Sequence, residues 1–415
     1  MNTRLLLLAT IVTVFLTACS PQGEIRRESS AAFVTVDGSR LVDPDGEAII
    51  LRGINLGNWL VPEGYMFKFD KAVAPWQIEQ VVKELIGPAE ARAFWDRYRD
   101  VYITKEDISF IKALGMNVVR VPFNYKLFTP EDYPEIWTGP GFDMLDRVIE
   151  WSREEGLYVL FDLHAAPCGQ TGENIDDSIG YPWLFESEEC QARTVDFWKK
   201  LAERYRDEPV VIGYDLLNEP IPHYPEYEKY NPLLEPLYKR ITTAIREVDP
   251  NHLIFLGGAQ WDSNFKVFGA PFDDKLVYTF HKYWTEPTAE VVQEYVAFRD
   301  SFNVPLLMGE SGENTDEWIT TFTRTLEEEE ISWTYWPYKK MDATSCVRTF
   351  DRPPFWDEIV AYQELFGASF EEKRKARPPQ EHIKAALEGL LENSRFENTR
   401  ANEGYIRALG LEPVL

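Results

Sequence analysis

Two glutamates, Glu219 and Glu310, each stand where a short apolar run gives way to polar residues. The first lies in Leu217-Asn218-Glu219-Pro220 and the second in Gly309-Glu310-Ser311-Gly312. A carboxylate at the end of a buried strand is costly unless it is paired or takes part in chemistry. Cleavage of a glycosidic bond uses two such groups, because one protonates the leaving oxygen while the other attacks the sugar carbon. The pair therefore indicates chemistry on a sugar.

Further polar and aromatic side chains stand in the same position after other apolar runs, namely Arg120, His164, His281, Tyr283 and Trp336. We expect Arg120 and Tyr283 to hold Glu310 ionised, one as a cation and the other as a hydrogen-bond donor. Asn218, beside Glu219, is suited to bond the 2-hydroxyl group of a sugar, a contact that strengthens in the transition state. All these side chains should converge on one cavity.

Eight apolar runs would bring these residues together, several of them apolar throughout, as parallel strands buried on both faces are. They cover residues 51–56, 118–123, 158–164, 211–218, 253–257, 277–281, 306–309 and 333–336. Stretches with helical periodicity lie between them, for example 105–114, 144–154, 190–205 and 233–248. This alternation predicts an α/β fold, a (β/α)8 TIM barrel with its functional residues at the carboxyl ends of the strands. The alternative is a doubly wound sheet, but no GxGxxG phosphate turn follows an early strand.

We expect one catalytic barrel over residues 33–366, beginning with a β-hairpin that closes its bottom. Residues 367–415 should form a C-terminal helical extension packed on the barrel. Its clearest helix is 378–393, where Ile383, Leu387, Leu390 and Leu391 fall on one face.

Residues 1–18 are typical of an export signal, with Arg4 before a twelve-residue apolar run that is shorter than the ~20 residues of a membrane-spanning helix. The run ends in Leu16-Thr17-Ala18-Cys19, which resembles a bacterial lipoprotein cleavage box. That resemblance implies a lipid on Cys19, followed by a flexible tether over 19–32, and Ser20 points to the outer membrane of a Gram-negative bacterium. The alternative is an ordinary secretory signal that leaves the protein periplasmic or secreted.

Three cysteines remain after Cys19. Cys168 and Cys190 flank one loop and are the expected disulfide pair, which leaves Cys346 as a thiol. The cysteine spacing is not a zinc pattern, and no HExxH motif accompanies His164 and His281. We therefore expect no metal and no cofactor.

The chain is acidic, with 43 Lys and Arg against 69 Asp and Glu and a formal charge of −26. Such a surface repels phosphate backbones and anionic lipids, which argues against nucleic-acid binding. The expected partner is an oligo- or polysaccharide, contact with a membrane is expected only through the lipid on Cys19, and we expect a monomer.

The ordered set of strand-end residues resembles glycoside hydrolase family 5, the cellulase-like retaining glycosidases of clan A, over residues 33–366. Its elements are Arg, His, Asn-Glu-Pro, His-x-Tyr, Gly-Glu-Ser and Trp, in this order. The resemblance implies Glu219 as acid/base and Glu310 as nucleophile, with no metal. It also implies retained configuration, for which the carboxyl groups lie ~5–5.5 Å apart.

Two segments resemble the exo-1,3-β-glucanase branch of this family. They are residues 52–59, which contain Asn55 and Trp59, and His164-Ala165-Ala166-Pro167 through Gln170. This chain has Gly57-Asn58-Trp59 where the branch has Gly-Gly-Trp, and Pro167-Cys168-Gly169-Gln170 where it has Pro-Gly-Ser-Gln. We expect cleavage of a β-glucan or its oligosaccharides. The alternatives are mannan, xyloglucan or another β-glycoside, or a glycan-binding lipoprotein without catalysis.

Aromatic residues make up 14% of the chain, and four tryptophans follow strand ends: Trp59, Trp261, Trp284 and Trp336. An indole face can lie against the C–H face of a pyranose, so we expect these four to contact sugar. We make no prediction for Glu63, although it follows Asn55 and Trp59 closely.

Overall fold

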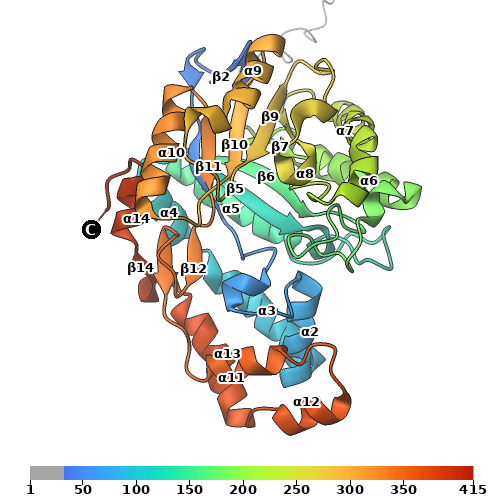
Figure 1. Cartoon of the computed structure of the whole chain (residues 1–415), viewed down its shortest axis with the longest axis vertical. Coiled ribbons are helices and arrows are strands. Elements are labelled where there is room, and N and C mark those ends of the chain that lie inside the picture. Colours follow the sequence, from blue (N-terminus) through green and yellow to red (C-terminus); the bar gives the residue numbers. More distant parts are fainter. Residues whose placement is uncertain (1–31, 415) are drawn as a thin grey trace, which may run out of the picture.

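The computed structural model describes residues 32–414, and its centre is a closed barrel of eight parallel strands (Figure 1). The strands are β4 (Arg52–Asn55), β5 (Val118–Asn124), β6 (Tyr158–Ala165), β7 (Val211–Asp215), β8 (Leu253–Gly257), β9 (Leu276–His281), β10 (Leu306–Glu310) and β11 (Ser332–Tyr335). They follow one another around the barrel in chain order, and β11 pairs with β4 to close it. Each expected apolar run supplies one strand, so the predicted (β/α)8 barrel is confirmed.

Helices lie outside the barrel between consecutive strands. They are α4 (Lys105–Ala113), α5 (Gly141–Glu155), α6 (Glu188–Tyr205), α7 (Asn231–Arg246), α9 (Gln293–Phe302) and α10 (Asp316–Glu328). The short segment α8 (Ala259–Asp262) after β8 is instead a turn with left-handed backbone at residues 260–262. α6 shows why these segments are helical, because Phe197, Trp198 and Leu201 are buried on one face. The Ser187 side chain caps its first turn by accepting a hydrogen bond from the Cys190 N–H.

A three-stranded sheet precedes the barrel, formed by β1 (Thr35–Asp37), β2 (Arg40–Val42) and β3 (Ala48–Ile49). Its Val34 and Leu41 pack in one apolar cluster with Leu51, Val118 and Leu253, which lie at or just before the starts of barrel strands. The hairpin therefore closes the amino-terminal end of the barrel, as expected, and leaves the opposite end for function.

Beside the barrel stands a helical lobe (Figure 1), of which only the helix at 378–393 was predicted from the sequence. We use this name for five helices: α2 (Pro75–Ile86), α3 (Pro88–Tyr102), α11 (Trp356–Gln363), α12 (Phe370–Ala376) and α13 (Gln380–Asn393). The first two are inserted between β4 and α4, and the other three follow the last barrel strand. α13 packs on α3 and α11, so the two ends of the chain build the lobe together.

The C-terminal extension contacts both the lobe and the barrel. α13 lies in the lobe, whereas α14 (Glu403–Ala408) packs against α10 of the barrel. Between them, β14 (Arg400–Ala401) pairs with β13 (Arg348–Phe350), which also pairs with β12 (Lys339–Met341). The end of the chain is thereby tied to the segment that follows the eighth barrel strand.

Cys168 and Cys190, the expected pair, form a disulfide between the end of β6 and the start of α6. The export signal, the lipidated Cys19 and all of the tether except residue 32 lie outside the described residues. Within residues 32–414, no helix has the length and apolar character needed to cross a bilayer.

Candidate active site

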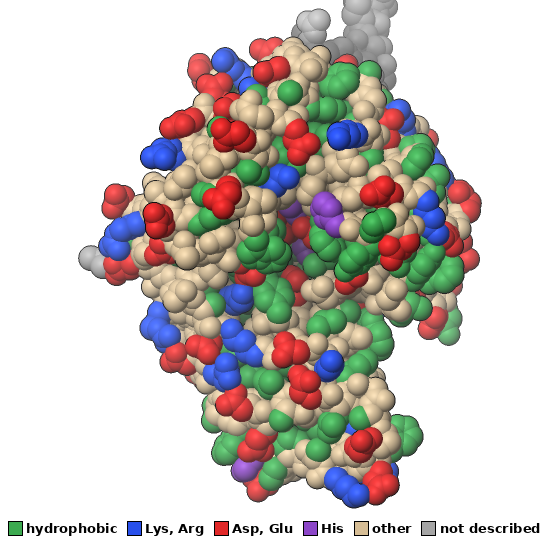
Figure 2. Space-filling view, viewed as in Figure 1, with side chains coloured by type: hydrophobic (Ala, Val, Ile, Leu, Met, Phe, Trp, Pro, Cys, Tyr) green, Lys and Arg blue, Asp and Glu red, His purple; other side chains and the backbone are tan. Residues whose placement is uncertain are grey.

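The residues that follow the barrel strands surround one pocket of about 640 Å³ at the carboxyl ends of the strands. Figure 2 shows a hollow near the centre of this face, with acidic and histidine side chains inside it. The pocket is lined by nine of the residues singled out in the sequence: His164, Asn218, Glu219, Trp261, His281, Tyr283, Trp284, Glu310 and Trp336. The structure thus brings together residues separated by up to 172 positions, from His164 to Trp336.

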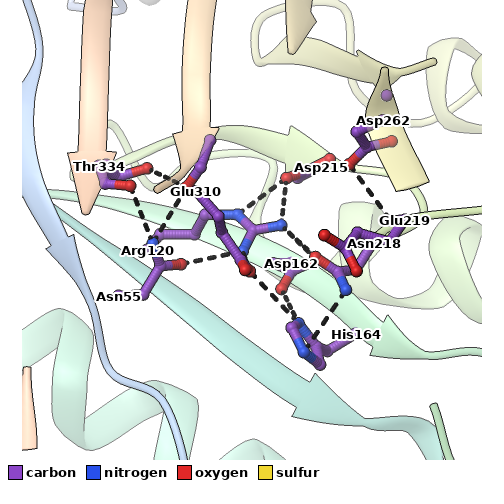
Figure 3. A network of polar contacts seen from close by, with 12 residues as sticks. Asn55, Arg120, Asp162, His164, Asp215, Asn218, Glu219, Asp262, Glu310 and Thr334 are labelled. Atoms are coloured by element: carbon purple, nitrogen blue, oxygen red, sulfur yellow. Dashed lines mark hydrogen bonds and ion pairs between the residues drawn. The ribbon is translucent and has the colours of Figure 1, made fainter. Parts of the chain in front are cut away.

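Arg120 lies beneath the pocket, completely buried, at the centre of a polar network (Figure 3). Its Nη1 is 2.6 Å from Glu310 Oε1, and its Nη2 is 2.8 Å from Asp215 Oδ2 and 3.1 Å from Asp162 Oδ1. Burial lowers the pKa of Arg120, but Asp162, Asp215 and Glu310 outweigh that effect and raise it, so the guanidinium stays charged.

Two amides complete the surroundings of this cation. Arg120 donates from Nη1 to Asn55 Oδ1 and from Nη2 to Asn218 Oδ1, both at 2.9 Å. The Asn55 amide in turn donates to the carbonyl oxygens of Gly309 and Thr334, which fastens β4 to β10 and β11. Asn55 is buried and does not line the pocket, so it acts here as a support for Arg120.

Glu310 is held in place from two sides. Arg120 bonds its Oε1, and the Tyr283 hydroxyl donates to its Oε2 at 3.1 Å. A cation and a hydroxyl donor both favour an ionised carboxylate. This arrangement suits a nucleophile, and it matches the surroundings expected for Glu310.

Glu219 has different surroundings. Burial raises its pKa to about 7, although His164 and Arg120 act in the opposite direction. Its Oε1 lies 2.8 Å from His281 Nδ1. Burial also lowers the pKa of His281 to about 3, so that imidazole is neutral at neutral pH. A carboxyl that keeps its proton near neutral pH suits a general acid.

The separation of the two carboxyl groups selects between the two known stereochemical courses of glycoside hydrolysis. An oxygen of Glu219 and an oxygen of Glu310 lie within 4.8 Å of each other, with His281 Nδ1 beside both. Retaining enzymes place these groups ~5–5.5 Å apart, whereas inverting enzymes leave ~6.5–9.5 Å for a water molecule. The geometry is that of a retaining pair.

His164 and Trp336 form one wall of the pocket. His164 Nδ1 lies 2.8 Å from Asp162 Oδ2, and the imidazole stacks on Trp336 with 5.6 Å between ring centroids. Burial lowers the pKa of His164 to about 4, so it too is neutral at neutral pH. The Trp336 indole N–H donates to the Tyr65 hydroxyl at 2.6 Å, which leaves the indole fixed at the pocket wall.

Of the four tryptophans predicted to contact sugar, three lie at the pocket and one does not. Trp261, Trp284 and Trp336 line the pocket, and Trp284 is 75% exposed at its mouth. The expectation that Trp59 contacts sugar is wrong, because Trp59 is 2% exposed in the apolar core and its indole donates to the Arg99 carbonyl of α3. The preceding Asn58 has a φ of 62°, and this left-handed turn directs the chain back towards the core.

The same turn explains a departure from the exo-1,3-β-glucanase pattern. Asparagine tolerates left-handed backbone better than most residues, so it can replace the glycine of that pattern at position 58. Its Oδ1 also accepts the N–H of Glu63 at 2.9 Å. The substitution therefore preserves the turn and fastens the segment that follows it.

The residues that line the pocket and were missed in the sequence include Glu63, Tyr65, His223 and Glu313. Glu63 is only 3% exposed, and its Oε1 has no hydrogen-bond partner among the described residues. Burial first, and then the nearby Glu310, Glu313 and Glu219, raise the pKa of Glu63 well above its ordinary value. The only available signal was its position soon after the first strand.

Two sets of three side chains bring metal-ligand atoms within 4.8 Å of one another: Asp162, His164 and Glu310, and Glu219, His281 and Glu310. Each set contains an imidazole bonded to a carboxyl group, and both share Glu310, which Arg120 already neutralises. The arrangement is accounted for by these hydrogen bonds and ion pairs, and the expectation of a metal-free site stays a prediction.

Comparison with known proteins now decides the family. Residues 80–342 match the family described as Cellulase (glycosyl hydrolase family 5). The chain belongs to glycosyl hydrolase family 5. This membership confirms the expected enzyme class, a retaining hydrolase of β-glycosides.

Individual relatives carry different names. A β-xylosidase of Phanerodontia chrysosporium is 34% identical over 64% of this chain and 52% of its own length. A probable glucan 1,3-β-glucosidase A of Aspergillus clavatus is 34% identical over 50% of this chain and 49% of its own length. Endoglucanase C of Acetivibrio thermocellus is 28% identical over 66% of this chain and 94% of its own length. The chain thus spans about half the length of the β-xylosidase and of the 1,3-β-glucosidase.

Solved structures show the shared fold. A crystal structure of endogalactoceramidase superimposes with a TM-score of 0.58 and 20% identity, over 74% of this chain and 75% of that one. A crystal structure of rutinosidase from Aspergillus niger superimposes with a TM-score of 0.56 and 17% identity, over 70% of this chain and 90% of that one. At such identities the likeness extends to the barrel fold alone.

The raised pKa of Glu219 has a consequence for stability. Its ordinary pKa of 4.5 in the unfolded chain becomes about 7 in the folded protein, so folding favours the protonated form. The wild type should lose stability as the pH rises from 4.5 to 7, whereas Glu219→Gln cannot ionise. We expect the variant to gain about 3 kcal/mol over wild type between pH 4.5 and pH 8.

Urea unfolding at a series of pH values measures this difference. Glu228→Gln, at an exposed site, is the matched control and should show no such gain because its carboxylate stays in water. If the difference in free energy of unfolding between Glu219→Gln and wild type did not change with pH, the raised pKa of Glu219 would be contradicted.

Proposed function

We propose that this protein is an exo-acting β-glycosidase that releases the terminal sugar of a β-glucan or β-glucan oligosaccharide with retention of configuration. The observation that carries this proposal is the contrast between the buried Glu63 and Trp336 at one end of the pocket and the exposed Trp284 at the other, with the two carboxyl groups between. The proposal concerns the whole protein, its substrate and the roles of its residues.

In the proposed reaction, a Glu310 oxygen attacks the anomeric carbon while Glu219 gives its proton to the leaving oxygen. The aglycone departs and the sugar remains as an ester on Glu310. Glu219, now ionised, takes a proton from the water molecule that hydrolyses this ester, and both glutamates return to their starting states. Their different surroundings support these roles, because Arg120 and Tyr283 stabilise the negative charge of Glu310 while burial opposes the ionisation of Glu219.

The position of the acid orients the substrate. The leaving oxygen must approach Glu219, so the aglycone lies towards the residues that follow β7, β8 and β9, which include His223, Trp261 and Trp284. The sugar to be released then lies towards Glu63, Tyr65 and Trp336, which follow β4 and β11.

These two ends differ in exposure. Glu63 is buried and the Tyr65 hydroxyl is bonded to the Trp336 indole, while the Lys340 ammonium lies 4.5 Å from the Tyr65 ring centroid and pairs with Glu313. We infer that these contacts form a wall beyond the terminal sugar. By contrast, Trp284 is exposed at the aglycone end, where an indole face can support the next sugar. The Glu63 carboxyl, whose pKa burial raises, is available to hydrogen-bond hydroxyl groups of the terminal sugar.

The substrate class draws on relatives as well as on the pocket. A 1,3-β-glucosidase and a β-xylosidase, two names of terminal-sugar hydrolases, are among the relatives at 34% identity. The acidic surface disfavours uronic or sulfated glycans. Mannan, xyloglucan and other β-glycosides remain the competing substrates, and a glycan-binding role without catalysis is the competing function.

Removal of either carboxyl group tests the proposed roles. Glu310→Ala and Glu219→Ala should each lower turnover of an aryl β-glycoside ~10³-fold or more. With an activated aryl glycoside, azide should rescue both: Glu219→Ala should give a β-glycosyl azide and Glu310→Ala an α-glycosyl azide. Proton NMR identifies the two products, and Glu228→Gln should behave as wild type. Near-wild-type turnover in either alanine variant removes the assignment.

Product analysis tests exo action. On laminarin, lichenan, cellulose and mannan, the wild type should release monosaccharide alone from the earliest times, and one of the glucans should be the best substrate. Oligosaccharides blocked at the non-reducing end should resist cleavage, whereas those modified at the reducing end should be cleaved. The reason is that only the non-reducing sugar must enter the walled end of the pocket. A ladder of oligomers would instead show endo action, and absence of reducing sugar from the whole panel would favour a binding protein.

We also propose that the protein is exported and anchored in the outer membrane by a lipid on Cys19. The lipoprotein-like box supports this, and so does the Cys168–Cys190 disulfide, since disulfides are typical of oxidising compartments.

Expression in a Gram-negative bacterium with a labelled fatty acid tests the anchor. The wild type should carry label and fractionate with the outer membrane, while Cys19→Ser should be unlabelled. An unlabelled, periplasmic wild type would indicate the ordinary secretory signal instead.

A further inference from the structure

Asp262 is a buried acid that the proposed mechanism has not yet used. It ends α8, directly after β8, where residues 260–262 all adopt left-handed backbone with φ values of 52°, 55° and 59°. None of the three is glycine, and such conformations persist only where the surrounding structure imposes them. This turn places the Asp262 carboxyl group next to the catalytic centre rather than in solvent (Figure 3).

The turn is joined to the segment that carries Glu219. Asp262 Oδ2 accepts the backbone N–H of Glu219 at 3.2 Å, and the Ile221 carbonyl accepts the N–H of Trp261 at 3.1 Å. Glu219 and Ile221 are themselves left-handed, with φ values of 48° and 61°. A Cβ on Gly257 would lie 1.9 Å from Asp262 Oδ1, so a glycine is needed there to make room for the carboxyl group.

His281 stands between Asp262 and the Glu219 side chain. Its Nδ1 is 2.8 Å from Glu219 Oε1, and its Nε2 is 3.3 Å from Asp262 Oδ2. Nε2 has no partner with hydrogen-bond geometry among the described residues, and Asp262 Oδ2 is the carboxyl oxygen that lies beside it. Because Oδ2 already accepts an N–H from Glu219, it offers the imidazole an acceptor rather than a donor. The single proton of a neutral imidazole therefore belongs on Nε2, and the Nδ1 lone pair faces Glu219.

We propose that Asp262 is a positioning residue for catalysis, which holds His281 as the Nε2–H tautomer so that Nδ1 accepts the acid proton of Glu219. An acceptor beside a carboxyl group stabilises its protonated form. Glu219 then keeps its proton until the leaving oxygen takes it. This inference rests on the proposed role of Glu219 as the acid.

Other charged or titratable groups also face this pair, and they are named because they influence the same proton. Asp215 from β7, Glu219 and Arg120 from β5 act on Asp262, while Glu310 from β10, Arg120 and His164 from β6 act on His281. Burial, the largest effect, raises the pKa of Asp262 well above its ordinary value. A neutral Asp262 keeps Oδ2 as an acceptor when its proton is on Oδ1, the oxygen that has no hydrogen-bond partner among the described residues.

Two variants separate the acceptor from the charge. Asp262→Ala removes the acceptor and lets the imidazole proton move to Nδ1, where it stabilises ionised Glu219. With an alkyl β-glycoside, kcat/KM should fall ~10²-fold, and the alkaline limb of its pH profile should move down by about one pH unit. Asp262→Asn keeps a carbonyl oxygen in place of Oδ2 and should remain close to wild type in both measurements.

A substrate that needs no acid provides the control for structural damage. The 2,4-dinitrophenolate group leaves without protonation, so Asp262→Ala should keep most of its kcat/KM on the 2,4-dinitrophenyl glycoside. Equal losses on both substrates, no loss on either, or equal effects of the Asn and Ala variants would each overturn the inference.

The acid assignment is tested separately. If wild type cleaves both glycosides and Glu219→Ala loses activity only on the alkyl glycoside, the acid assignment stands whatever the Asp262 variants show. If Glu219→Ala keeps the alkyl activity, the acid assignment and this inference fail together.

A measurement on the wild type covers the case in which Asp262→Ala does not fold. In protein labelled with ¹⁵N-histidine, the signals lost in His281→Gln identify this ring. We expect a protonated Nε2 and an unprotonated Nδ1 at neutral pH. A protonated Nδ1 would overturn the inference without bearing on the glycosidase activity.

Discussion

The buried guanidinium of Arg120 is the interaction on which the active site depends. Three carboxyl groups, those of Asp162, Asp215 and Glu310, lie within 3.1 Å of its nitrogen atoms. The side chains of this cluster are at most 6% exposed. Isolated buried charges are strongly unfavourable, and removal of one partner of such a cluster typically costs ~3–5 kcal/mol. The cation therefore makes it possible to concentrate acids at the carboxyl ends of the strands.

This cluster also makes the two glutamates unequal. Glu310 contacts Arg120 directly, whereas Glu219 contacts a neutral imidazole and has its pKa raised by burial to about 7. Both residues are at most 9% exposed, so the difference in solvent access is small. The nearest partners differ instead: a cation contacts Glu310, whereas an imidazole contacts Glu219, so that no direct ion pair opposes the effect of burial on the pKa of Glu219.

The barrel could be predicted from the sequence because parallel strands buried on both faces leave continuous apolar runs, and the residue after each run must lie at one end of the barrel. This reasoning found Arg120, Asn55 and nine residues that line the pocket, but not the buried Asp162 and Asp215 that pair with Arg120. It failed where the chain turns sharply. Trp59 follows a strand end but turns into the core at Asn58, and Asp262 reaches the site only through three left-handed residues. Neither turn leaves a periodic pattern in the sequence.

The wall of the pocket could not be predicted for a different reason, since its position depends on contacts between distant parts of the chain. Glu63 and Tyr65 lie at the start of a short 3₁₀ helix, Gly64–Phe67, and the segment from this helix to Ala72 is bonded to the helical lobe. The Trp356 indole donates to the Phe67 carbonyl at 2.9 Å, and Gln363 Oε1 accepts the backbone N–H groups of Lys71 and Ala72 at 2.9 and 3.0 Å.

Those lobe residues come almost 300 positions later in the chain, beyond the last barrel strand. The C-terminal extension adds a second support, because the Tyr405 hydroxyl donates to the Trp336 carbonyl at 3.4 Å. The barrel thus supplies the two carboxyl groups, and the elements added around it supply the closed end. Under the proposed function, different parts of the molecule set substrate length and chemistry, because the lobe and the C-terminal extension support the wall whereas the Arg120 network supports the two carboxyl groups.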